Sequence, residues 1–155
     1  RWPVGEGIDL AILVENMGRV NFGARMDGQR KGIDGGVLLN GHYHMGWNCH
    51  PLELEDAQLN AIDWTAGWRE GDPGFHRFQL EVDEPADTFV DMSGWGKGCL
   101  FVNGFNLGRF WEKGPQMRLY LPAPLMKKGT NELVVFESDG IVGPAPKLWD
   151  KPDLG

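Results

Sequence analysis

The stretch FVNGFNLGRFWEKGPQ, residues 101–116, carries the strongest fold signal in the chain. Its Asn103-Gly104 pair lies between two apolar segments and favours a type I′ turn, because both turn positions require a positive φ. The sequence therefore predicts a tight hairpin over residues 98–110. Gly108 interrupts the second strand of this hairpin, which indicates a β-bulge or a close backbone approach. We assign Asn103, Gly104 and Gly108 structural roles in the turn.

Side-chain alternation after the turn separates two faces of the second strand. Phe110 is expected to point inward, with Arg109 and Trp111 on the opposite face. A planar Trp stacks on sugar rings and an Arg binds their hydroxyls, so one interpretation of Arg109 and Trp111 is a carbohydrate site. The other is a contact in which Trp111 packs on a neighbouring domain and Arg109 is ion-paired. The residues alone favour this second interpretation.

The dominant hydrophobic period in the rest of the chain is two, which is typical of half-buried β-strands. Helical patterns are short and confined to residues 122–128 and 55–63, where Leu59 and Ile62 are expected to face inward. They cannot cover a parallel sheet, so the sequence favours an all-β fold, an antiparallel β-sandwich. The expected strands are residues 8–15, 37–39, 76–82, 88–92, 98–102, 116–121 and 131–137.

Composition and charge exclude several classes of protein. The 155 residues include 23 Gly and 10 Pro spread along the chain, which indicates many turns and no disordered tract. The formal net charge is -7, and no run of Lys or Arg exceeds two residues. A phosphate-binding surface is therefore not expected, and nucleic acid is excluded as a partner.

The sequence also bears on membrane contact and on thiol chemistry. The longest apolar run, residues 10–14, is too short to cross a bilayer, and the N-terminal residues lack the long apolar core of a signal peptide. We expect a soluble chain with no membrane partner, and its compartment is left open. The first residue is not Met, so a fragment or a processed form is expected. Cys49 and Cys99 could form one bridge, but two free buried thiols are favoured.

Side chains suited to metal binding or catalysis gather in three places. Residues 42–50, HYHMGWNCH, offer three His and one Cys, but their spacing fits no standard zinc site, so packing is favoured and no metal is expected. Two acidic clusters lack the apolar surroundings that raise a carboxyl pKa, so they are interpreted as solvated turns. The sequence contains no nucleophile motif or phosphate loop, and we predict no catalytic residue and no cofactor. The acidic clusters are Glu53, Glu55 and Asp56, and Asp83, Glu84 and Asp87.

One internal similarity bears on how the chain divides. IDLAILVEN, residues 8–16, resembles NELVVFESD, residues 131–139, when Glu15 is aligned with Glu137. The second segment follows a KKGTN turn and is expected to be a closing strand. The first is then interpreted as the closing strand of a preceding sandwich, and two unrelated strands of similar composition are the alternative.

Three segments together resemble the C-terminal region of glycoside hydrolase family 35 β-galactosidases. They are LVENMGRVNFG (13–23), SGWGKGCLFVNGFNLGRFWEKGPQ (93–116) and LYLPAPLMKKGTNELVVFE (119–137). The resemblance implies β-domains of the galactose-binding-like jelly-roll type. It assigns residues 1–40 to the closing strand and linker of a preceding β-domain, and residues 41–155 to a galactose-binding-like jelly-roll domain.

The family resemblance also carries functional expectations. Such enzymes hold two catalytic Glu in an N-terminal (β/α)8 barrel, which needs about 250 residues and has no counterpart here. The parent is expected to be a retaining β-galactosidase that hydrolyses terminal non-reducing β-D-galactose, and this chain is predicted to be inactive. Its expected partners are its own barrel and a preceding β-domain, which it braces. The alternative is a carbohydrate-binding module for galactosides. The predicted carbohydrate or interdomain contact residues are Trp95, Arg109, Trp111 and Arg19.

Overall fold

The computed structural model describes residues 7, 9–18 and 20–153. It divides into two compact units, Arg1–Pro51 and Leu52–Gly155. Within the described residues, one short α-helix, α1 (Asp56–Asn60), and two 3-10 turns, η1 (Met26–Gly28) and η2 (Ala123–Leu125), accompany the strands. No helix in this described part is long and apolar enough to cross a membrane.

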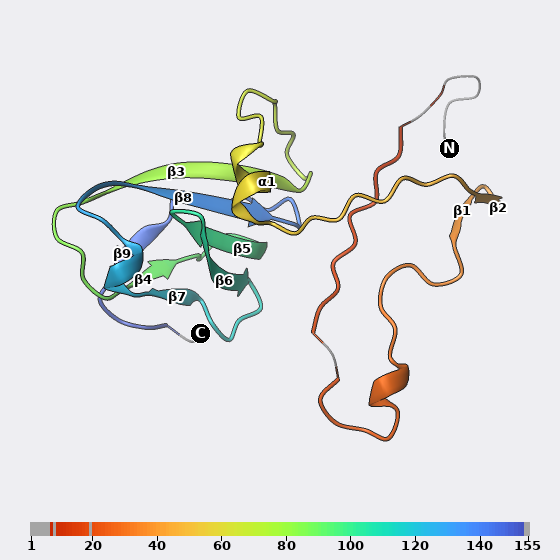
Figure 1. The fold of residues 1–155 in the computed structure, drawn as a ribbon, viewed down its shortest axis with the longest axis horizontal. Coiled ribbons are helices and arrows are strands. Elements are labelled where there is room, and N and C mark those ends of the chain that lie inside the picture. The colour runs from red at the N-terminus through yellow and green to blue at the C-terminus, as the bar shows by residue number, and fades with distance from the viewer. Residues whose placement is uncertain (1–6, 8, 19, 154–155) are drawn as a thin grey trace. The chain divides into compact units, whose positions relative to one another are not determined.

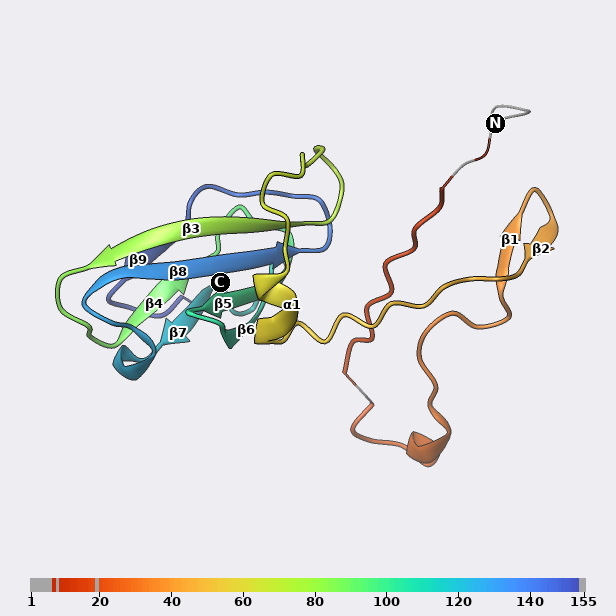
Figure 2. The same cartoon turned by 45° about the horizontal axis from the view of Figure 1, so that its top comes forward.

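The second unit is an antiparallel β-sandwich, with β3 and β8 running side by side in both ribbon views (Figures 1 and 2). One sheet has the strand order β3-β8-β5-β6 and the other the order β7-β4-β9. Every neighbouring pair in both sheets is antiparallel, which confirms the predicted all-β sandwich. The strands are β3 (Gly74–Val82), β4 (Thr88–Asp91), β5 (Lys97–Val102), β6 (Phe105–Trp111), β7 (Arg118–Leu121), β8 (Gly129–Glu137) and β9 (Lys147–Trp149).

The main hydrophobic core lies between the two sheets. Val90 and Leu121 of the three-stranded sheet, and Leu100 and Val135 of the four-stranded sheet, have no exposed surface. These side chains alternate with outward-facing residues, as a two-layer sandwich requires. Burying one aliphatic side chain of this size contributes about 1.5–3 kcal/mol, so the alternation found in the sequence is what stabilises the unit.

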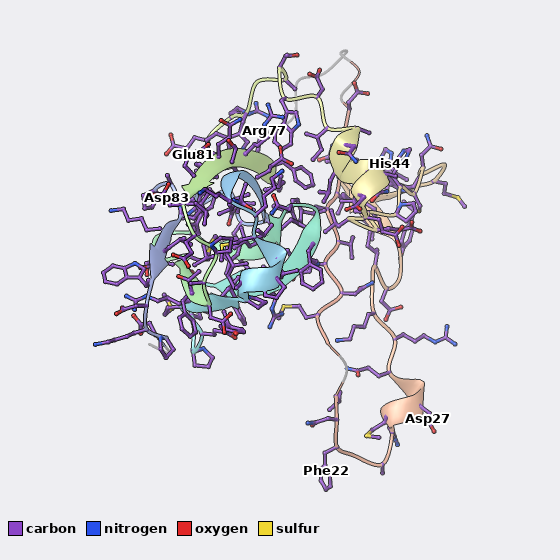
Figure 3. The ribbon with its side chains drawn as sticks, turned by 60° about the vertical axis from the view of Figure 1, so that its left-hand side comes forward. Phe22, Asp27, His44, Arg77, Glu81 and Asp83 are labelled. Carbon is purple, nitrogen blue, oxygen red and sulfur yellow. The ribbon has the colours of Figure 1, made fainter. Side chains whose placement is uncertain are left out.

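A smaller apolar cluster covers part of the outer face of the four-stranded sheet. Leu59 of α1 packs with Phe101 of β5 and Val134 of β8, and all three are buried. Trp64 joins this cluster, with the Arg77 guanidinium carbon 4.6 Å from its ring centroid. Arg77 projects from β3 in Figure 3. The helical signal in the sequence therefore corresponds to a short helix that shields part of the sheet.

The first unit contains little regular structure. Its described residues form η1 and a hairpin of β1 (Val37–Leu39) and β2 (His42–His44). Phe22 extends away from its loop (Figure 3) and is 88% exposed. The strand predicted at residues 37–39 is confirmed, whereas its partner β2 was not predicted.

The strand predicted over residues 8–15 is not found in its described part, residues 9–15. Leu10, Ile12 and Val14 are 38%, 45% and 44% exposed there. A strand needs a neighbour that completes its ladder of backbone hydrogen bonds, and no ladder in the described chain includes these residues. The apolar alternation is present in the sequence, but alternation alone supplies no pairing partner.

Candidate functional site

The candidate site is built on the hairpin of β5 and β6, and the sequence explains the turn. Asn103 and Gly104 have φ angles of 49° and 83°, the positive values that a type I′ turn requires. The Asn103 amide nitrogen donates hydrogen bonds to the Leu125 carbonyl oxygen (2.8 Å) and to Asn131 Oδ1 (2.9 Å). The Asn103 amide oxygen accepts a hydrogen bond from the backbone N–H of Glu132 (3.0 Å). Asn103 therefore ties the hairpin to η2 and to β8.

A β-bulge follows the turn. Leu100 pairs with Gly108, whereas the next residue, Phe101, pairs with Asn106, so the register shifts by one residue on β6. Gly108 has a φ of 140°, a conformation that residues with a side chain rarely adopt. The bulge resets the alternation of β6, and it decides which side chains of the remaining strand face outward.

Trp111 is the centre of a cationic cluster on the outer face of the four-stranded sheet. Phe110 is 2% exposed in the core, so alternation directs Arg109 and Trp111 outward. Three cations approach the Trp111 ring centroid: Lys97 Nζ at 5.9 Å, Arg109 Cζ at 5.8 Å and Lys113 Nζ at 5.3 Å. These distances lie within the range of cation–π attraction. We call these four residues the Trp111 cluster.

The Trp111 cluster combines an aromatic surface with hydrogen-bond donors. Trp111 is half-buried, while Arg109 and Lys113 are exposed. Lys97 also forms an ion pair with Asp139, with Nζ and Oδ1 3.3 Å apart. A partly exposed ring beside several donors can stack on a sugar ring or pack against a partner that presents carboxylates. The arrangement is compatible with both interpretations of Arg109 and Trp111.

Trp95 does not belong to this surface. Its side chain is 1% exposed, and its Nε1 donates a hydrogen bond to the Pro144 carbonyl oxygen at 2.9 Å. The ring packs edge-on against three other aromatic rings. The expectation that Trp95 contacts a sugar or another domain is therefore corrected, because the ring fills the sandwich core. Arg19, the fourth predicted contact residue, lies outside the described residues.

A buried carboxylate at the end of β8, Glu137, was not singled out from the sequence. It is 0% exposed, and its two oxygens accept hydrogen bonds from the backbone N–H groups of Lys97 (2.9 Å) and Ile141 (3.0 Å). Burial lowers the pKa of the neighbouring His76, and the negative charge of Glu137 partly opposes this effect. Because both oxygens of Glu137 bind backbone groups, we assign it a structural role. The available signal was the alternation in residues 133–137, which places Glu137 on the inner face.

The histidine-rich segment, residues 42–50, shows no metal centre. Among the residues that the structure describes, no group of three or more His, Cys, Asp or Glu could hold a metal ion. The segment is exposed throughout, so the expected packing of its side chains is not found, and Trp47 Nε1 donates to the His44 carbonyl oxygen (2.8 Å). Cys49 and Cys99 form no disulfide, in agreement with the favoured interpretation, and Cys99 is half-buried. Cys49 is exposed, contrary to the expected burial, because no core forms around it.

One member of the acidic clusters, Asp87, has a defined structural role. Its carboxylate accepts hydrogen bonds from the backbone N–H of Ala123 (2.9 Å) and from the Tyr120 hydroxyl (2.7 Å), and these bonds lower the pKa of Asp87. Tyr120 lies in register with Phe89, which lies in register with Trp149. This aromatic row on the three-stranded sheet was not recognised from the sequence, although alternation already placed Tyr120 outward.

The observed geometry first defines a class. Two antiparallel sheets around one apolar core, with a bulged hairpin at one sheet edge, form an all-β domain of the antiparallel sandwich class.

Comparison with known proteins then identifies the family. Residues 73–131 match the model of the beta-galactosidase galactose-binding domain, and residues 3–53 match that of the first all-beta domain of beta-galactosidases. The chain is 40% identical over 151 residues to human Beta-galactosidase-1-like protein 2, a match that covers 94% of this chain and 24% of the relative. It is 44% identical over 119 residues to a beta-galactosidase of Xanthomonas manihotis, covering 77% of this chain and 19% of that relative.

A third relative is Beta-galactosidase 1 of Dictyostelium discoideum, 39% identical over 141 residues, with 84% of this chain and 20% of the relative covered. The chain belongs to the beta-galactosidase family and matches two of its all-β domains. It spans about a fifth to a quarter of the length of these curated relatives.

Proposed function

We propose that this chain is the non-catalytic β-domain part of a beta-galactosidase and that it braces the catalytic barrel of that protein. The whole protein would hydrolyse terminal non-reducing β-D-galactose residues. This part would position the barrel and contribute no catalytic group of its own. The two domain matches support this role, because both family models describe all-β or galactose-binding domains.

The Trp111 cluster is the observation that carries the bracing role. A half-buried Trp on an edge strand, held among three cations, supplies the aromatic and Arg side chains that dominate binding energy at protein interfaces. The cations would pair with carboxylates of the barrel surface, which would set the orientation of the contact. Arg109 and Trp111 are therefore the proposed barrel-contact residues.

The first unit supports a second contact within the same protein. We propose that the first unit comprises the closing strand and linker of a preceding β-domain and that the second unit forms the jelly-roll domain, which moves the expected boundary from residue 40 to near residue 51. The apolar side chains of residues 9–15 are exposed, and the other strands of that preceding domain would cover them. Their exposure agrees with the family match over residues 3–53.

A binding experiment tests the bracing role. The 155-residue chain is immobilised, and the catalytic barrel from the same source, prepared without its β-domains, is passed over it. Trp111→Ala and Arg109→Ala should each weaken binding by at least about 10-fold, as expected for interface anchors. Phe105→Ala, which removes an exposed ring from the same strand, serves as the control. If both cluster variants bind as the control does, the Trp111 cluster is not the brace.

Direct galactoside binding is the second candidate function, and the partly exposed Trp111 ring beside Arg109 favours it. Calorimetry of the chain against galactose and lactose separates the two candidates. Millimolar or tighter binding that is lost in Trp111→Ala would support a carbohydrate-binding module, whereas no heat would support the brace. A nitrophenyl galactoside in the same samples tests activity, and turnover that persists through purification would contradict a non-catalytic role.

A further inference from the structure

The outer face of the three-stranded sheet carries a row of aromatic rings. Tyr120 of β7 lies directly opposite Phe89 of β4, and Phe89 lies directly opposite Trp149 of β9. Residues in direct register point to the same face of a sheet. The adjacent residues of the same strands, Val90 and Leu121, are fully buried in the core, so the aromatic row faces outward.

The outer two rings of the row are exposed, yet the structure holds each of them in place. Tyr120 is 47% exposed, and its hydroxyl donates to Asp87 Oδ2 at 2.7 Å. Trp149 is 44% exposed, and the Arg118 guanidinium carbon lies 4.2 Å from its ring centroid. The central ring, Phe89, lies 5.5 Å from Tyr120 between centroids. Rings fixed in this way lose little conformational entropy when a ligand stacks on them.

Arg118 is itself anchored by the chain that follows β9. Its Nη1 donates to the Lys151 carbonyl oxygen at 3.1 Å, and its Nη2 lies 3.7 Å from Asp153 Oδ2. Its Nε lies 3.6 Å from Asp91 Oδ2. Burial acts to raise the pKa of Asp91, but the Ser93 hydrogen bonds and the Arg118 charge outweigh it and lower that pKa. The carboxylate is therefore a fixed acceptor beside the row.

Carboxylates outnumber cations around the aromatic row. Three carboxylates, Asp87, Asp91 and Asp153, and two cations, Arg118 and Lys147, border it, and the strand positions of this face carry no aliphatic side chain. A protein interface of stable size needs an apolar centre surrounded by further contacts, which this face does not provide. A polyanion would meet more carboxylates than cations and would be repelled. The complementary ligand is uncharged, with apolar faces for stacking and hydroxyls for both donors and acceptors.

A hollow of about 270 Å³ lies beside the row and extends this surface. Its lining includes Trp149, the apolar side chains of Val82, Met126 and Leu148, and the carboxylates of Glu84, Asp87 and Asp150. A sugar ring beyond Trp149 would therefore meet both apolar surface and carboxylate acceptors. Aromatic walls with a few converging polar groups are the usual composition of sites for small polar ligands.

We propose that the aromatic row Tyr120–Phe89–Trp149 is a binding site for an uncharged oligosaccharide. The row crosses three strands, about 9.6 Å at the usual strand spacing, so it accommodates more than one sugar ring. This site lies on the opposite sheet from the Trp111 cluster. The proposal does not depend on the bracing role. It places sugar binding on the three-stranded sheet, whereas the galactoside binding considered above uses Trp111 on the four-stranded sheet.

Binding of the complete 155-residue chain to lactose and to linear galacto- and gluco-tetrasaccharides, measured by calorimetry, tests the site. The tetrasaccharides should bind more tightly than lactose, because they reach more of the row. Trp149→Ala and Tyr120→Ala should each weaken binding by about 3- to 10-fold, the usual contribution of one aromatic contact. Tyr120→Phe keeps the ring but loses the hydrogen bond to Asp87, and it should weaken binding less than Tyr120→Ala does.

Phe105→Ala is the matched control, because it removes an exposed aromatic ring from the other sheet. It should leave oligosaccharide binding unchanged. Circular dichroism and urea unfolding show whether each variant remains folded, and Tyr120→Phe gives a second test if an alanine variant unfolds. Loss of binding in Trp111→Ala alone would overturn the inference, and so would the absence of binding to all three sugars. Binding of the barrel that is lost in Trp149→Ala would show that the row is a protein contact instead.

Discussion

Glu137 offers the sharpest test of how the sandwich is held together. Glu137→Leu removes the acceptor of the Lys97 N–H (2.9 Å) and the Ile141 N–H (3.0 Å) at a position with 0% exposure. An unsatisfied buried donor costs about 1–3 kcal/mol, so two donors predict a loss of about 2–6 kcal/mol in the free energy of unfolding. The Leu variant also removes the cost of burying a charge, which favours the lower half of that range. Glu137→Gln keeps one acceptor oxygen, so its free energy of unfolding should fall by only about 1–3 kcal/mol.

Urea unfolding, followed by Trp fluorescence and far-UV circular dichroism, measures these free energies by linear extrapolation. Glu132→Gln on the same strand is the control. The Glu132 side chain is 51% exposed and makes a 3.9 Å contact with Arg77, so this variant should change stability by less than about 0.5 kcal/mol. Amide exchange at Lys97 and Ile141 should accelerate in Glu137→Gln. If both Glu137 variants unfold at the same urea concentration as the control, the carboxylate does not anchor these amides.

Two further predictions concern backbone packing and pH. A Cβ at Gly98 would collide with the Phe136 carbonyl oxygen, so Gly98→Ala should lower the free energy of unfolding by about 1–3 kcal/mol or more. A Cβ at Gly67 meets open space, so Gly67→Ala should unfold at the same urea concentration as the parent chain. Burial lowers the pKa of His76 in the folded chain below its ordinary 6.5, so as the pH falls His76 takes up a proton in the unfolded chain before it does in the folded one. The free energy of unfolding should therefore be highest above pH 6.5 and should fall as the pH drops below that value. His76→Gln should reduce the difference in melting temperature between about pH 7.5 and about pH 5.5. An unchanged difference would show that His76 does not cause the loss of stability at low pH.

Local signals in the sequence were sufficient for most of the sandwich. Asn103-Gly104 predicts the hairpin because the conformation that the turn needs is a property of those two residues. In the segments that form β3, β7 and β8, the alternation of apolar and polar residues already identifies which side chains face the core. Where a residue's own conformation or its strand's own alternation decides the structure, the sequence alone identifies it.

The features that sequence reasoning missed depend on partners far away in the chain. Lys147–Trp149 is too short to show a period, and it is a strand because it pairs with β4. Residues 9–15 show a clear period and form no strand, because no ladder within the described part of the chain includes them. Trp95 is flanked by Gly and resembles a loop residue, but Pro144 accepts its indole hydrogen bond and the core encloses its ring.

The motif that identifies the family divides into two parts with different physical causes. Asn103, Gly104 and Gly108 are required by a turn and a bulge, and the inward-facing Phe110 fills the core, so these residues are accounted for without any ligand. Trp111, with the cations around it, satisfies no requirement of the turn or of the main core. An aromatic ring kept partly exposed on an edge strand gains more from a partner than from the fold itself. We therefore propose that any functional role of the motif belongs to its outward-facing residues, Arg109 and Trp111.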